Sequence, residues 1–221
     1  MLSSCLDYVL GVRLLFVCTG NLCRSPVAEC LTRAWIAPLL DGQAAAVHVS
    51  SAGLEAREGE PMDPRSANAL VQLGGDPAAF AARHFRAAMA EDADLVLTMT
   101  RRQRRSVLAA TPRGLRRTFT LLEAVDLLSR ADLSGLDSEQ SLEKRASVLA
   151  GRLDAARAFR AASSADDIPD PIGRPDRVHR TVAGIIGDAL KPLVTTLVPS
   201  ASAEDLMRFD GEQTVASPDR A

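Results

Sequence analysis

Cys18 and Arg24 are separated by five residues, and this pair carries the most specific chemical information in the sequence. The thiolate form of cysteine is a nucleophile, and the planar guanidinium group of arginine can hold two phosphate oxygens. A loop of this length can curl so that both side chains point into one cradle. The pair therefore indicates phosphoryl transfer, with Cys18 as the nucleophile and Arg24 as the phosphate-binding residue.

The elements on either side of this loop suit the same chemistry. Residues 13–18 form a short apolar run, which predicts a buried parallel strand. Ser25-Pro26 predicts a helix start, because serine is a good N-cap and proline is favoured at the first helical position. Ligands of open α/β folds bind at the carboxyl ends of strands, and a helix N-terminus offers unpaired N–H groups to an anion. A phosphate site is therefore expected between this strand and this helix.

The residues of the loop are expected to surround the phosphate. Gly20 permits backbone conformations that other residues resist, and Asn21 tolerates a left-handed turn. Cys23 has two interpretations: a small buried residue, or a redox partner that traps oxidised Cys18 as a reversible disulfide. The predicted substrate-binding residues are Thr19, Gly20, Asn21, Leu22, Cys23 and Ser25.

The rest of the chain predicts an α/β fold. Apolar runs at residues 46–51, 93–99 and 117–121 read as further strands, and helical patterns cover residues 64–73, 143–162 and 174–197. Alternation of strands and helices favours a parallel sheet with helices on both faces. The domain is expected to span residues 13–198 with an insertion at about 129–165, while residues 1–12 and 199–221 read as terminal extensions.

Composition limits the possible partners and the compartment. The net charge is −2, so the chain has no overall attraction to nucleic acid or to a membrane surface. All four cysteines lie within the first thirty residues and no histidine stands near them with zinc-finger spacing, so neither a disulfide scaffold nor a structural zinc site is expected. The start of the chain lacks the pattern of a secretory signal, which favours a cytoplasmic protein. The oligomeric state is left open.

With these features in place, the chain resembles the low-molecular-weight protein-tyrosine-phosphatase family of bacterial type. The resemblance is carried by residues 17–29, VCTGNLCRSPVAE, and by shorter segments that agree in order and spacing: Ser51-Ala52-Gly53, Asp63-Pro64, His84, residues 93–99 and Pro169-Asp170-Pro171. It implies a flavodoxin-like or Rossmann-like three-layer fold with a four-stranded parallel sheet, no metal and no cofactor. It also implies a cysteinyl-phosphate intermediate on Cys18, thiolate stabilisation by Ser25, and a phosphotyrosine-containing protein, such as a tyrosine kinase, as the partner.

A phosphatase also needs a group that protonates the leaving oxygen, and a carboxylic acid can do so. Asp170 lies between two prolines that stiffen its loop, while Asp166, Asp167 and Asp176 are nearby alternatives. The residues alone leave this choice open. The resemblance implies Asp170 as the general acid and base.

Two departures from the family pattern bear on the substrate. Ile172 stands where the family usually has tyrosine after Asp-Pro, and Leu54-Glu55-Ala56 lacks the aromatic residue of many members. Both changes remove ring surface that would stack on phosphotyrosine. The alternatives are an arsenate reductase that uses an external thiol and a phosphate-binding module without turnover. An arsenate reductase with a disulfide relay would need cysteines beyond Cys30, and the sequence has none. A module without turnover conflicts with the presence of both nucleophile and acid.

Overall fold

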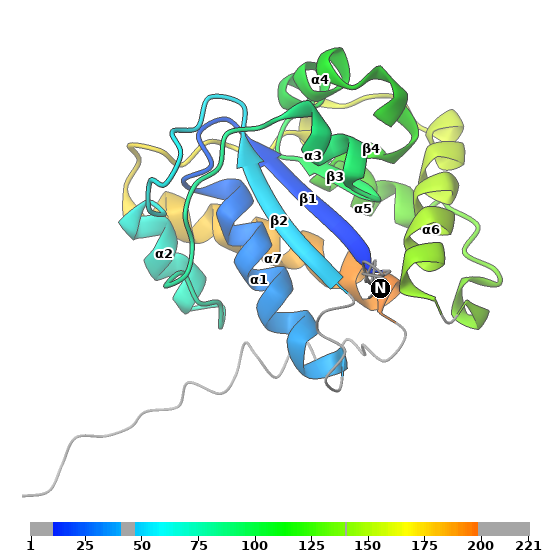
Figure 1. Cartoon of the computed structure of the whole chain (residues 1–221), viewed down its shortest axis with the longest axis horizontal. Coiled ribbons are helices and arrows are strands. Elements are labelled where there is room, and N and C mark those ends of the chain that lie inside the picture. Colours follow the sequence, from blue (N-terminus) through cyan, green and yellow to red (C-terminus); the bar gives the residue numbers. More distant parts are fainter. Residues whose placement is uncertain (1–10, 41–46, 140, 199–221) are drawn as a thin grey trace, which may run out of the picture.

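The computed structural model describes residues 11–40, 47–139 and 141–198. Its centre is a parallel four-stranded sheet in the order β2-β1-β3-β4, shown in Figure 1. The strands are β1 (Val12–Cys18), β2 (Val47–Gly53), β3 (Leu95–Thr98) and β4 (Thr118–Thr120). This architecture confirms the predicted three-layer α/β fold.

Helices cover both faces of the sheet (Figure 1). The α-helices are α1 (Arg24–Ile36), α2 (Pro64–Val71), α3 (Ala87–Asp92), α4 (Arg101–Ala110), α5 (Leu121–Leu128), α6 (Leu142–Ala156) and α7 (Asp176–Leu197). Short 3-10 helices occupy Ala37–Leu40, Pro112–Arg117, Leu136–Ser138, Arg157–Phe159 and Ser164–Asp166. Among the described residues, no helix combines the length and apolar character needed to cross a membrane.

Strand β1 divides the core in two because successive side chains point to opposite faces of a sheet. Leu14 and Phe16 pack into the larger core with residues of α1, α5, α6 and α7. Leu15 and Val17 pack into a smaller core with residues of α3 and α4. All four side chains are at most 4% exposed, so β1 and the loop that follows it rest on a rigid support.

Several predicted boundaries differ from the structure. Helix α1 begins at Arg24, and Ser25 is not its N-cap, because the Ser25 hydroxyl contacts the thiol of Cys18 instead. Helix α6 ends at Ala156 rather than at residue 162. The predicted terminal extensions lie outside the described residues, apart from residues 11 and 12; Val12 already belongs to β1.

Helix α5 was missed by the sequence interpretation, which placed no helix directly after β4. Thr120 accepts a hydrogen bond from the N–H of Glu123, and the Glu123 carboxylate accepts one from the N–H of Thr120. This capping box has a sequence signature, Thr-Leu-Leu-Glu, that could have identified the helix. The predicted strand 117–121 instead extends one residue into this helix, because Leu121 is equally apolar in either structure.

Arg145 of α6 is a buried charge that joins three segments. Its Nε donates to the carbonyl of Thr196 at 2.7 Å and its Nη1 to the carbonyl of Leu136 at 2.5 Å, while Nη2 pairs with Asp137 at 3.1 Å. The side chain is only 2% exposed. Arg145 thereby connects the predicted insertion to the end of α7.

Replacing Arg145 with methionine should lower the free energy of unfolding by about 2–4 kcal/mol, because the buried carbonyl of Leu136 and the partly buried carbonyl of Thr196 lose their donor. Urea denaturation measures this change. Arg152→Met on the same helix is the matched control, since Arg152 forms a surface ion pair with the exposed Asp132 and its loss should give no measurable change. Equal stability of the two variants would contradict a structural role for Arg145.

Candidate active site

The loop between β1 and α1 lies at the carboxyl edge of the sheet. Cys18 is the last residue of β1 and Arg24 is the first residue of α1. Strand β1 has β2 on one side, to which the chain runs next, and β3 on the other, so this edge is the point where the strand order reverses. Such a position is where open α/β sheets bind ligands.

Two hydrogen-bond donors point at the sulfur of Cys18. The N–H of Asn21 lies 3.2 Å from Sγ and the hydroxyl of Ser25 lies 3.0 Å from it. Hydrogen bonds to the ionised form of a group favour that form. The loop and α1 thus each place one such donor at the sulfur of Cys18.

Asn21 fixes the shape of the loop. Its φ of 54° makes it the only non-glycine residue with positive φ in the described part of the chain. The side-chain amide donates to Ser25 Oγ at 2.9 Å and to Ser51 Oγ at 2.8 Å, and its oxygen accepts from the N–H of Arg83 at 2.8 Å. These bonds hold a strained backbone conformation that turns the Asn21 N–H toward Cys18.

Gly53 lets a second segment approach this loop. A Cβ at Gly53 would lie 2.6 Å from the carbonyl oxygen of Thr19 and 2.7 Å from the amide nitrogen of Asn21. Because glycine has no Cβ, the N–H of Leu54 donates to the carbonyl oxygen of Cys18 at 3.0 Å. The N–H of Glu55 donates to the carbonyl oxygen of Thr19 at 2.8 Å. Glycine is required here because any side chain would push the two segments apart.

A buried carboxylate supports the loop from behind. Glu29 of α1 is 1% exposed and accepts from Ser51 Oγ at 2.5 Å. Arg83 lies 2.6 Å from the same carboxylate, and Arg33 forms a further ion pair with it. The sequence analysis gave Glu29 and Arg83 no role. The available signal was a charged residue among the apolar positions of a predicted helix, because a charged side chain is rarely buried there unless it is paired.

Arg24 joins the loop to the segment that carries the candidate acid. Its side chain is 5% exposed, with Nη2 at 2.5 Å from Asp170 Oδ2 and Nη1 at 3.2 Å from the carbonyl oxygen of Ile168. The Asp170 side chain is 44% exposed, so it stands at the mouth of the site. Two residues that are 146 positions apart in the chain thus meet at the end of the loop that begins with Cys18.

The competing carboxylates are engaged elsewhere. Asp166 binds Arg160 at 2.8 Å, Asp167 accepts from the N–H of Arg101 at 2.6 Å, and Asp176 pairs with Arg65 at 3.2 Å. Of the four acidic residues that the sequence left as candidates, only Asp170 is placed against Arg24. The role of Asp170 as the acid stays a prediction, which this contact supports.

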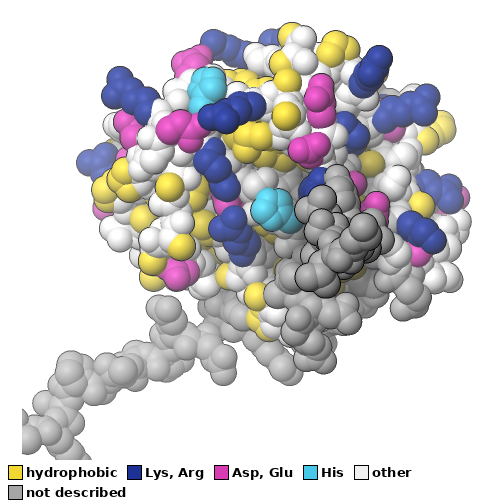
Figure 2. All heavy atoms as spheres, in the orientation of Figure 1, with side chains coloured by type: hydrophobic (Ala, Val, Ile, Leu, Met, Phe, Trp, Pro, Cys, Tyr) yellow, Lys and Arg dark blue, Asp and Glu magenta, His cyan; other side chains and the backbone are white. Residues whose placement is uncertain are grey.

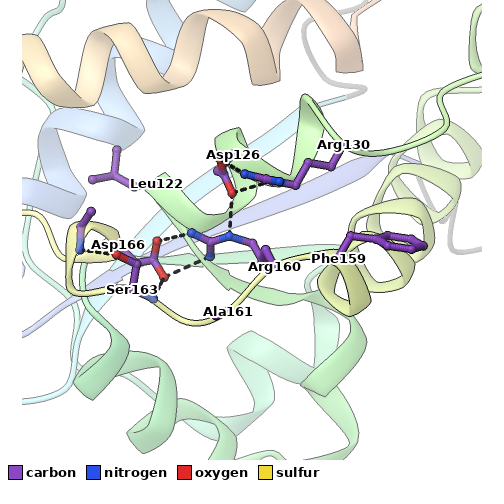
Figure 3. A pocket seen from close by; sticks show the side chains of 9 residues that line it. Leu122, Asp126, Arg130, Phe159, Arg160, Ala161, Ser163 and Asp166 are labelled. Atoms are coloured by element: carbon purple, nitrogen blue, oxygen red, sulfur yellow. Dashed lines mark hydrogen bonds and ion pairs between the residues drawn. The ribbon is translucent and has the colours of Figure 1, made fainter.

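The approach to Asp170 is anchored at a second place, shown in Figure 3. Arg160 lies between Asp126 of α5 and Asp166, at 2.6 and 2.8 Å, and Arg130 also binds Asp126. These residues line a pocket of about 510 Å³ together with Leu122 and Phe159. The pKa of Asp126 is lowered, chiefly by its hydrogen bond from Arg130. This network holds the segment before the acid loop against α5.

Cys23 is buried and differs from Cys18 in its surroundings. Burial raises the pKa of the Cys23 thiol to about 12, although a hydrogen bond with Ser66 acts in the opposite direction. Its Sγ lies within 4.8 Å of donor atoms of Asp63 and His179, a set that could hold a metal ion. In the structure His179 Nδ1 is instead 2.8 Å from Ser66 Oγ. The role of Cys23 as a redox partner stays a prediction.

Comparison with known proteins agrees with this geometry. Residues 13–139 match the family described as low molecular weight phosphotyrosine protein phosphatase. A probable low molecular weight protein-tyrosine-phosphatase, EpsP of Ralstonia solanacearum, is 36% identical over 110 residues, which are 50% of this chain and 70% of the relative. A protein-arginine-phosphatase of Geobacillus stearothermophilus is 29% identical over 192 residues, which are 87% of this chain and 97% of the relative.

Solved structures place the fold in the same group. The crystal structure of a low molecular weight protein tyrosine phosphatase from T. tengcongensis superposes with a TM-score of 0.59 at 26% identity. The match covers 85% of this chain and all of that one.

The cysteines should differ sharply in reactivity. Iodoacetamide reacts with thiolates, and the pKa values of about 12 for Cys23 and Cys30 keep both protonated below that pH. At pH 7 to 9 the reagent should modify Cys18 first, inactivate the protein in step with that modification, and be slowed by inorganic phosphate. Peptide mapping by mass spectrometry identifies the modified residue. Earlier modification of Cys23 or Cys30 would contradict the assignment of the donors to Cys18.

Proposed function

We propose that this chain, which belongs to the low molecular weight phosphotyrosine protein phosphatase family, removes the phosphoryl group from phosphotyrosine in proteins by means of Cys18, Arg24 and Asp170. Family membership makes it a phosphatase that forms a cysteinyl-phosphate intermediate. The assignment of roles to individual residues is our proposal. The observation that carries it is that Arg24 binds Asp170 while the next residue, Ser25, contacts the sulfur of Cys18 at the same edge of the sheet.

The first step transfers the phosphoryl group to the protein. The thiolate of Cys18 attacks phosphorus while the bond to the phenolic oxygen breaks, and protonated Asp170 gives its proton to that oxygen. Arg24 and the N–H groups of residues 19–24 bind the non-bridging oxygens, whose negative charge the positive end of α1 also favours. The Arg24–Asp170 contact opens as the guanidinium takes the phosphate.

The second step returns the thiolate. A water molecule attacks phosphorus, Asp170 accepts the proton of that water, and the phosphorus–sulfur bond breaks. Ser25 and the N–H of Asn21 stabilise the departing sulfur, because they are within hydrogen-bond distance of it before any substrate arrives. Inorganic phosphate then leaves. Each step uses groups of the chain itself.

The walls of the mouth support an aryl phosphate as substrate. Leu22 and Leu54 are partly buried beside the loop, and Ile172 is 49% exposed next to the acid segment. Aliphatic side chains give a phenyl ring apolar contact without the added energy of ring stacking, about 0.5–1.5 kcal/mol. We therefore propose hydrolysis of phosphotyrosine with modest discrimination against other aryl phosphates. The corresponding partner is a phosphotyrosine-containing protein of the cytoplasm, such as a tyrosine kinase.

Phosphoarginine is a second candidate substrate. The relative that aligns over most of this chain is named a protein-arginine-phosphatase. Glu55, which is exposed and whose N–H binds Thr19, could face the positive charge of a guanidinium leaving group. The apolar wall residues argue against it, because a cation is poorly solvated by leucine and isoleucine side chains.

A substrate comparison separates these functions. Phosphotyrosine and phosphoarginine peptides of the same sequence should differ in kcat/KM by at least tenfold in favour of phosphotyrosine. Vanadate should inhibit and a chelator should have no effect. A preference for phosphoarginine would reverse the assignment of substrate, and thiol-dependent consumption of arsenate without phosphatase activity would indicate an arsenate reductase. Cys18→Ser, which replaces the nucleophile with a far weaker one, should abolish hydrolysis and serves as the control.

The role of Asp170 has a separate test. Asp170→Asn should lower kcat about 10²–10⁴-fold for poorly departing phenols, which need a proton. The loss should shrink for an activated phenol such as nitrophenol, so kcat is measured against leaving-group pKa. Asp176→Asn is the control, because Asp176 pairs with Arg65 at the start of α7 and should change kcat little. A uniform loss over all phenols would assign Asp170 a role in positioning only.

A further inference from the structure

The first turn of α4 lies between the two loops of the active site. Gln103 Nε2 donates to Thr19 Oγ1 of the phosphate loop at 3.0 Å. The N–H of Arg101 donates to Asp167 at 2.6 Å, three residues before Asp170. Arg102 stands between these two contacts and is exposed. Side chains of a helix lean toward its N-terminus, so Arg101 and Arg102 lean toward the edge of the sheet where Cys18 lies.

This turn carries more positive charge than a helix start favours. Arg101, Arg102, Arg104 and Arg105 occupy four of the first five positions of α4, and the turn contains no acidic residue. A helix N-terminus already has partial positive charge, so basic side chains there cost stability. Local violations of this kind in natural proteins are expected at functional sites.

The four arginines fall into two pairs. Arg101 lies 3.5 Å from Asp167 and Arg104 lies 3.6 Å from Glu123, so these two charges are balanced within the fold. Arg102 and Arg105 are exposed, and no carboxylate among the described residues forms an ion pair with either. Their positive charge is therefore available to a partner at the edge where Figure 1 places α4 and where Figure 2 shows several basic side chains.

We propose that Arg102 and Arg105 bind acidic side chains next to the phosphorylated residue of a protein substrate. The inference rests on the proposed function, because it describes what flanks the phosphotyrosine. It commits to one class of substrate: a phosphorylated segment with Asp or Glu within a few residues of the phosphate. The chemistry is charge complementarity outside the catalytic centre, so it adds to kcat/KM for peptides and does not act on a small phosphate ester.

The opposite side of the mouth has the opposite charge. Glu55 is exposed and belongs to the segment whose N–H groups bind Cys18 and Thr19. A peptide lying across the site would meet Arg102 and Arg105 on one side and Glu55 on the other. Acidic residues of the peptide are therefore favoured on the α4 side, which fixes the direction in which the peptide chain crosses the site.

The test compares phosphotyrosine peptides that differ only in their flanks, with Glu, Gln or Lys at the same positions. Wild type should prefer the Glu peptide over the Gln peptide by about two- to fivefold in kcat/KM for each ion pair formed, and the preference should fall as salt is added. Arg102→Glu combined with Arg105→Glu should reverse the order so that the Lys peptide is preferred. Hydrolysis of nitrophenyl phosphate should stay within twofold of wild type.

Arg113→Glu is the matched control, since Arg113 is exposed in the 3-10 helix Pro112–Arg117 that follows α4, and it should leave the order of the peptides unchanged. Equal kcat/KM for the Glu and Gln peptides in wild type would overturn the inference and leave the proposed function intact. An equal effect of Arg113→Glu would also overturn the inference, because the preference for the Glu peptide would then depend on net charge and not on Arg102 and Arg105. If nitrophenyl phosphate is hydrolysed and none of the phosphotyrosine peptides is, the proposed function fails and the inference fails with it.

Discussion

The conformation of Asn21 is the constraint on which the rest of the site depends. A left-handed residue at this point turns one backbone N–H toward the Cys18 sulfur, and the side chain of the same residue holds the Ser25 hydroxyl that is the second donor. The strained conformation persists because Ser51 and the N–H of Arg83 occupy the remaining polar groups of Asn21. Backbone geometry thus places both donors at the Cys18 sulfur before any substrate binds.

The loop in turn needs a charged support inside the protein. Burying Glu29 would be costly by itself, but Arg33, Arg83 and the Ser51 hydroxyl compensate its charge. Because these partners come from α1, β2 and the loop before α3, the network ties three parts of the chain to the phosphate loop. The sheet keeps the loop rigid, and the contacts of Glu29 fix how the three segments are aligned. The loop therefore has one conformation.

The acid reaches the site by a different route. Arg160 and Arg101 hold Asp166 and Asp167, and the N–H of Ile168 binds the carbonyl of Met99 at 2.8 Å at the end of β3. These anchors leave Asp170 as the first acidic side chain free to turn toward Arg24. The first turn of α4 contributes to both halves, since it contacts the acid segment through Arg101 and the phosphate loop through Gln103. Its exposed arginines, Arg102 and Arg105, stand beside these contacts and outside the catalytic groups.

The sequence by itself determined the strand, loop and helix around Cys18 and Arg24, because the strand pattern, the turn residues and the anion site of a helix start are all local. It determined the parallel sheet through the alternation of elements. Local pattern left the choice among the four aspartates open, and the resemblance implied Asp170. Neither indicated what supports Asn21, and the capping signature of α5 was overlooked although it is local. Only the tertiary structure showed which aspartate contacts Arg24 and which groups hold Asn21, because contacts such as Arg24–Asp170 and Asn21–Ser51 join residues far apart in the chain. Such contacts depend on how the elements pack, and no local spacing encodes them.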